Sequence, residues 1–257
     1  MHSPANPAIS HQEITSASKF VSPTKSNDAR SGSVTLLGLG FMACLITLCA
    51  GTLHAADNSG ASLKAGDEFL SKQDYDHAMT EYDAAVKQAD SPGMKSLSLG
   101  KKGEVYLAQK NYTAAKQAAD EALTVQELAP VAKVIALKVL GECQLKGEPK
   151  DYPGAIKSLE AAYALQGVDW AQPLVALLLG DAYRFSGDSE KAIATLTKLT
   201  EMPNANNGIK AIAYLNLGSS YQYNKKDAAQ AKAAYQKAVE LNPDLKKTVD
   251  EHLAKLN

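Results

Sequence analysis

A glycine that recurs about every 38 residues constrains the fold of this chain more than any other sequence feature. The five glycines are separated by 37, 38, 39 and 38 residues, and they are Gly66, Gly103, Gly141, Gly180 and Gly218. An alanine follows each glycine after 12 to 14 residues, at Ala78, Ala115, Ala155, Ala192 and Ala231. Self-similarity at such a period marks a repeat architecture, so the sequence predicts an array of equivalent units.

Each unit is predicted to be a pair of helices. The abundant alanine and lysine favour helix over strand. Glycine within a helix costs about 1 kcal/mol relative to alanine, so five glycines at equivalent places indicate a close approach of two helices, with the alanines as the opposing surface. The residue three positions after each glycine is usually aromatic and shares its helix face, as at Phe69, Tyr106, Gln144, Tyr183 and Tyr221.

This pattern resembles the tetratricopeptide-repeat (TPR) family over about residues 59–257. The segments Leu179-Gly180-Asp181-Ala182-Tyr183 and Leu217-Gly218-Ser219-Ser220-Tyr221 match its first helix, and residues 231–243 (AKAAYQKAVELNP) are close to its consensus. The period exceeds the usual repeat of about 34 residues. The usual tryptophan is also replaced, by Ser62, Leu99, Leu137, Ala176 and Tyr214.

The resemblance implies an all-α fold, a right-handed helical-hairpin solenoid of about five TPR units with a C-terminal capping helix. The units are expected at about 59–92, 96–130, 134–169, 173–207 and 211–244, with the cap at 245–257. One hairpin cannot bury its apolar face alone, so neighbours must stack and the last one needs a polar cap. In the cap, an apolar stripe is formed by Leu245, Val249, Leu253 and Leu256, and Asn242 is placed to cap the helix.

The N-terminal residues differ from the repeats in composition. Residues 1–30 are rich in Ser, Pro, Asn and Thr, which predicts a disordered segment. Residues 31–56 lack charged side chains, follow Lys25 and Arg30, and end in small residues, as in a secretory signal peptide cleaved after Ala55 or Ala56. An uncleaved membrane anchor and a lipidated cysteine, Cys44 or Cys49, are the alternatives. We therefore expect an exported protein of the periplasm or cell envelope.

The resemblance also implies where a partner would bind, because the first helix of each TPR hairpin lines a concave groove. The residue after the glycine is acidic in four units, at Asp67, Glu104, Glu142 and Asp181. The same helix side carries Lys138, Leu177 and Leu215 three residues before a glycine, and Phe185 and Tyr223 five residues after one. The predicted groove is apolar with an acidic stripe, and Phe185 and Tyr223 are its aromatic anchors. A solvated charged face is the alternative for the acids, and core packing for the two leucines.

The expected function is that of a scaffold or adaptor that binds a peptide segment of another protein. Carboxylates stand where TPR clamps for a C-terminal carboxylate have Asn, so a segment with apolar and basic residues fits better. The alternatives are a small molecule or glycan stacked on Tyr223, Phe185 and Trp170, and self-assembly through repeat faces. The oligomeric state is left open.

Catalytic, metal and cofactor sites are not predicted, and the chain is not expected to be an enzyme. After the expected cleavage site only His77 and His252 remain, and they belong to distant units. Cys143 is expected to be a small buried hydrophobe. Phosphate-loop, dinucleotide and metalloprotease motifs are missing from the sequence, and the net charge of −1 gives no indication of nucleic-acid binding.

Overall fold

A computed structural model describes residues 58–126 and 128–256, and within these ranges the chain is helical without strands. The segments predicted as disordered (1–30) and as a signal peptide or anchor (31–56) lie outside the described residues. Across the described ranges, every helix is too short or too polar to cross a membrane.

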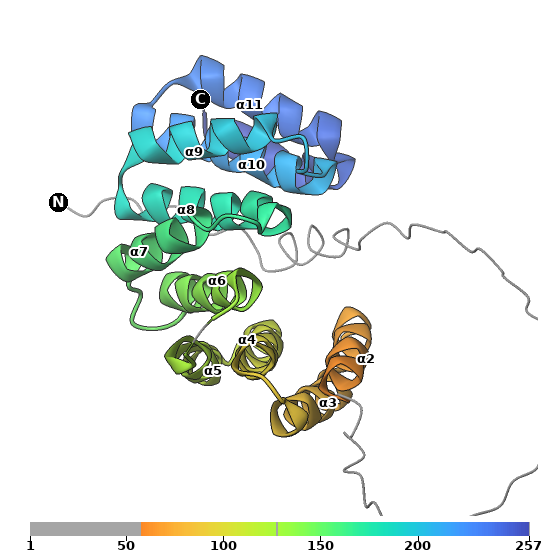
Figure 1. Cartoon of the computed structure of the whole chain (residues 1–257). Helices are drawn as coiled ribbons and strands as arrows, with labels where there is room; N and C mark the ends of the chain where they lie inside the picture. Colours follow the sequence, from red (N-terminus) through yellow and green to blue (C-terminus); the bar gives the residue numbers. More distant parts are fainter. Residues whose placement is uncertain (1–57, 127, 257) are drawn as a thin grey trace, which may run out of the picture.

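Ten helices of the described residues form five consecutive hairpins (Figure 1). They are α2 (Ser59–Ser71) with α3 (Tyr75–Gln88), α4 (Pro92–Ala108) with α5 (Tyr112–Thr124), α6 (Pro130–Lys146) with α7 (Tyr152–Tyr163), α8 (Gln172–Ser186) with α9 (Ser189–Glu201), and α10 (Asn207–Ser219) with α11 (Ala228–Leu241). Three short elements join them, the 3-10 turns η1 (Asp169–Ala171) and η3 (Pro243–Leu245) and the π-helical turn η2 (Ser220–Lys225); α12 (Lys246–Leu253) follows the last hairpin.

The hairpins stack in chain order. The second helix of each hairpin packs against the first helix of the next, and successive first helices also contact one another, as α4 does with α6 and α8 with α10. Figure 1 shows the resulting array running from α2 to α11. This stacking confirms the predicted all-α solenoid of helical hairpins.

A repeated turn reverses the chain within each hairpin. Every second helix begins after an Asp or Asn whose side chain accepts a hydrogen bond from a backbone N–H of the first turn; these N-caps are Asp74, Asn111, Asp151, Asp188 and Asp227. In four hairpins the residue before the cap has a positive φ, namely Gln73, Lys110, Gly187 and Lys226. A left-handed residue that ends one helix, followed at once by the cap of the next, gives a tight reversal.

The recurring glycines lie where the two helices of a hairpin cross, as predicted, but the side chains that cover four of them are not the alanines. Large side chains four residues after the alanines cover Gly66, Gly141, Gly180 and Gly218; they are Tyr82, Leu159, Leu196 and Tyr235. A Cβ built on Gly180 would lie 2.6 Å from Leu196 Cγ. At Gly103 the nearest side chain is Val139 of α6, because the second hairpin has the small Ala119 at the covering position. The recurring alanines are buried beside these contacts.

The predicted capping helix is present as α12. Asn242 accepts a hydrogen bond from the backbone N–H of Asp244 at 3.1 Å, so it caps the short η3 turn that leads into the helix. Leu245 and Val249 are buried in the apolar cluster that α8 to α11 share, while Leu253 and Leu256 are partly buried against it. The polar side of α12 therefore closes this end of the described array.

Candidate interaction surface on the first helices

A row of polar side chains crosses all five first helices, and we name it the first-helix ladder. Its members are Asp67 of α2, Lys101 and Glu104 of α4, Lys138, Glu142 and Lys146 of α6, Asp181 and Arg184 of α8, and Asn216 of α10. It contains the four predicted acidic residues and Lys138.

The N-terminal part of the ladder joins three hairpins. Lys101 Nζ lies 3.1 Å from Asp67 Oδ1 and 3.1 Å from Glu104 Oε2, and the other oxygen of Glu104 is paired with Lys138. Burial alone would raise the pKa of Glu104, but Lys101 and Lys138 outweigh it and lower the pKa to about 2. Glu104 in turn raises the pKa of Lys101. Tyr82, which covers Gly66, donates a hydrogen bond of 2.7 Å to Asp67.

The C-terminal part of the ladder is more deeply buried. Glu142 Oε1 is 2.5 Å from Lys146 Nζ. Asp181 Oδ1 accepts hydrogen bonds from Arg184 Nη2 at 2.8 Å and from Asn216 Nδ2 at 2.9 Å, so it ties α8 to α10. Asp181 and Arg184 are both almost fully buried, and the Arg184 guanidinium also lies 4.1 Å from the centroid of the Phe185 ring.

The four carboxylates of the ladder therefore each have a cationic neighbour. Asp67, Glu104, Glu142 and Asp181 are matched by Lys101, Lys138, Lys146 and Arg184. The stripe predicted as acidic is electrically balanced, because the first helices also supply the lysines and the arginine. A balanced row attracts a basic segment much less than four unpaired carboxylates would.

Two residues assigned to the groove belong to the core. Leu177 and Leu215 are 1% and 0% exposed and lie in the same apolar cluster as Leu196, Leu199 and Tyr235. Helix α8 packs against α7, α9 and α10, and α10 packs against α8, α9 and α11, so a leucine on this part of either helix packs against another helix. Neither side chain can contact a partner, and the groove assignment of both is wrong.

The two predicted aromatic anchors are partly buried and lie at different hairpins. The Phe185 ring stacks on Tyr152 of α7 with centroids 5.8 Å apart. The Tyr223 ring, in η2, meets His252 of α12 edge-on at 6.1 Å. Each keeps part of its surface accessible, so each remains a candidate contact for a partner.

Other chemistry is sparse in residues 58–126 and 128–256. These ranges hold no group of three His, Cys, Asp or Glu side chains that could bind a metal ion. Cys143 is buried, and burial raises the pKa of its thiol to about 12, which keeps the sulfur protonated and unreactive. His77 is an exposed partner of Asp74, and His252 is buried in the cap.

Comparisons with known proteins agree with this fold. Two family models described as tetratricopeptide repeat match the chain, one at residues 63–133 and 101–169, the other at 175–206 and 211–245. Curated proteins give no significant match. Among solved structures, MamA is 23% identical with a TM-score of 0.52 and covers 74% of this chain and 95% of its own. YrrB, described as a TPR protein with an unusual peptide-binding site, is 22% identical with a TM-score of 0.54 and covers 78% and 93%. At these sequence identities, the structural similarity shows a shared fold alone.

Proposed function

Because the chain belongs to the tetratricopeptide-repeat superfamily, we propose that it is a protein-interaction scaffold that holds a segment of a partner protein along its first helices. The first-helix ladder carries this proposal. Its partly exposed members lie in the first three hairpins, where Asp67, Lys101 and Glu104 keep 46%, 20% and 18% of their side chains exposed. Asp181, Arg184 and Asn216 are buried and join α8 to α10. The peptide-binding site named for the structurally similar YrrB supports the same use of the fold.

The charge balance of the ladder refines the kind of segment that would bind. Paired carboxylates and ammonium groups offer both acceptors and donors, which suits the backbone and the polar side chains of an extended segment. Net attraction of a basic segment is weak, so affinity must come mainly from apolar contacts. Phe185 and Tyr223 are partly exposed aromatic side chains on the predicted groove, and we propose that they contact apolar residues of the partner.

We expect that Phe185→Ala and Tyr223→Ala each weaken partner binding about tenfold, because a truncated aromatic anchor costs 1 kcal/mol or more at an interface. The measurement is affinity capture with the unchanged protein, followed by titration of overlapping peptides from the captured protein. Val131→Ala is the matched control, since Val131 is a 38% exposed apolar residue at the start of α6, outside the ladder. If all three variants bind as tightly as the unchanged protein and keep its circular dichroism, Phe185 and Tyr223 are not anchors for the partner.

The proposed setting is the cell envelope, reached by export through the apolar segment at residues 31–56. Cleavage after Ala55 or Ala56 would release a protein that begins at the first hairpin. Fractionation of expressing cells and the intact mass of the purified protein test this directly. A protein found in the cytoplasm with its full N-terminal mass would refute export while leaving the scaffold proposal intact.

A further inference from the structure

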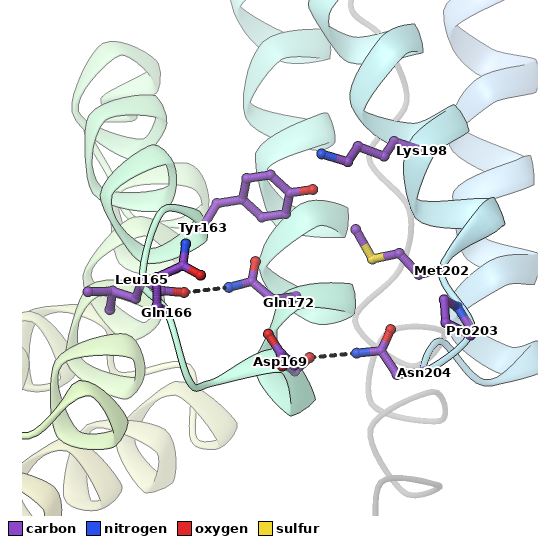
Figure 2. Close-up of a pocket in the computed structure, with 9 residues that line it drawn as sticks. All are labelled: Tyr163, Leu165, Gln166, Asp169, Gln172, Lys198, Met202, Pro203 and Asn204. Carbon is purple, nitrogen blue, oxygen red and sulfur yellow. Dashed lines mark hydrogen bonds between the residues drawn. The ribbon is translucent and has the colours of Figure 1, made fainter.

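The connection between the third and fourth hairpins is the longest of the four that join hairpins. It spans residues 164–171, including η1, whereas the others contain three to five residues. Together with the end of α9 and the turn after it, this connection borders an open hollow of about 520 Å³ (Figure 2). The hollow is lined by Tyr163, Leu165, Gln166, Asp169, Gln172, Lys198, Met202, Pro203 and Asn204.

Two amide side chains fix the walls of this hollow. Gln172 Nε2 donates to the Leu165 carbonyl at 3.2 Å, and Asn204 Nδ2 donates to the Asp169 carbonyl at 2.6 Å, which joins the connection to the turn after α9. The first bond also determines which end of the Gln172 amide faces the hollow. Figure 2 shows Gln172 Oε1 directed toward the space between Tyr163 and Met202.

Gln172 Oε1 is the strongest indication of a ligand. It is buried and has no hydrogen-bond partner. A buried acceptor without a donor costs about 1–3 kcal/mol, so a bound hydroxyl or amide N–H at this position would recover that free energy.

The other residues that line the hollow include one cation, one carboxylate and several apolar side chains. Lys198 Nζ lies 5.4 Å from the centroid of the Tyr163 ring. Asp169 supplies one carboxylate, so the two ionised groups of the hollow cancel. Leu165, Met202 and Pro203 add an apolar wall. A fitting ligand is uncharged, carries donors and acceptors close together, and has an apolar face.

We propose that this hollow is a binding site for a neutral saccharide. Sugar hydroxyls both donate and accept, so they suit Gln172 Oε1, Asp169 and Lys198 at once, and the C–H face of a sugar ring suits Met202 and Leu165. The volume lies in the usual range of small-ligand pockets. The site is separate from the first-helix ladder, because Gln172 and Asp181 are nine residues apart on α8, about 14 Å along the helix.

The only tryptophan of the chain makes the proposal testable. Trp170 is next to Asp169 and 54% exposed, so its fluorescence responds to changes at this connection. The full chain is titrated with cellotriose and with chitotriose, which differ by their acetamido groups. A saturable fluorescence change is expected with at least one of them. Gln172→Met and Lys198→Met should each weaken binding at least tenfold; Lys198→Met leaves the Gln172–Leu165 bond intact and so separates binding from folding.

Gln126→Met is the matched control, because Gln126 lines the corresponding hollow between the first and second hairpins and is exposed. It should bind like the unchanged protein. The proposal fails if neither trisaccharide changes the fluorescence, or if both lining variants bind with unchanged affinity. A fluorescence change with trialanine that Gln172→Met abolishes, without one for the sugars, would assign the hollow to a peptide instead. None of these outcomes depends on partner binding at the ladder.

Discussion

Glu104→Gln is expected to lower the free energy of unfolding by about 3 kcal/mol at pH 7. The substitution keeps the shape of the side chain but leaves Lys101 and Lys138 facing each other without the carboxylate between them. The pKa of Glu104 falls from its usual 4.5 to about 2 in the folded chain, a difference that corresponds to stabilisation on the order of 3 kcal/mol. Urea denaturation followed by circular dichroism and by Trp170 fluorescence measures the change.

The same pair of pKa values sets a pH dependence. Because the folded chain holds this carboxyl deprotonated more strongly than the unfolded chain does, the stabilisation is complete above about pH 4.5 and is lost as the pH falls toward 2. Glu104→Gln should remove this part of the acid sensitivity. Glu121→Gln is the control, because Glu121 is an exposed residue of α5. Its free energy of unfolding should change by less than about 0.5 kcal/mol. If the two variants are equally stable at pH 7, the ion pairs of Glu104 with Lys101 and Lys138 do not stabilise the fold.

Gly218→Ala is expected to destabilise the fold by about 1 kcal/mol, although alanine is the better helix former. A Cβ at this position would lie 2.4 Å from Tyr235 Cε1. The Tyr235 ring is fully buried, stacks on His252 and donates to Gln222 at 2.6 Å, so it cannot move aside freely. Overpacking of this kind costs about 1–3 kcal/mol, against a gain of about 1 kcal/mol in helix propensity.

Gly93→Ala provides the opposite case for the same substitution. Gly93 also lies in a helix, but a Cβ there meets only Ala129 Cβ at 3.9 Å, an ordinary contact. This variant should be as stable as the unchanged protein or slightly more stable. Urea unfolding of both variants decides the comparison, and a Gly218→Ala protein as stable as Gly93→Ala would mean that Tyr235 can repack.

The features that the sequence predicts well are local or repeated. The glycine and alanine spacing predicts the hairpins because the same packing requirement recurs in four of the five units, at the crossing of the two helices. The helix N-caps are also local, because the Asp or Asn side chain before a helix accepts a hydrogen bond from a backbone N–H of the first turn. Three of the ladder pairs also have helical spacing and could be found from the sequence; they are Lys101 with Glu104, Glu142 with Lys146, and Asp181 with Arg184.

The features that sequence reasoning missed depend on neighbours distant along the chain. Glu104 and Lys138 are 34 residues apart and meet only because α4 and α6 stack. Leu177 was assigned to the groove by its helix face, but α8 is buried on every side from Val175 to Arg184, so periodicity cannot separate groove from core there. The hollow beside Gln172 depends on a long connection that has no counterpart in the repeat pattern.

The residue that covers each recurring glycine distinguishes the ends of the array from its middle. Leucine covers Gly141 and Gly180, whereas tyrosine covers Gly66 and Gly218 in the outermost described hairpins. Each tyrosine fills the same gap and carries a hydroxyl to a polar partner, Asp67 at one end and Gln222 at the other. The third and fourth hairpins thus share an apolar covering residue, whereas the outer two hairpins add a hydrogen-bonded hydroxyl at the same position. A change in the middle of the array therefore leaves these two hydroxyl contacts at its ends in place.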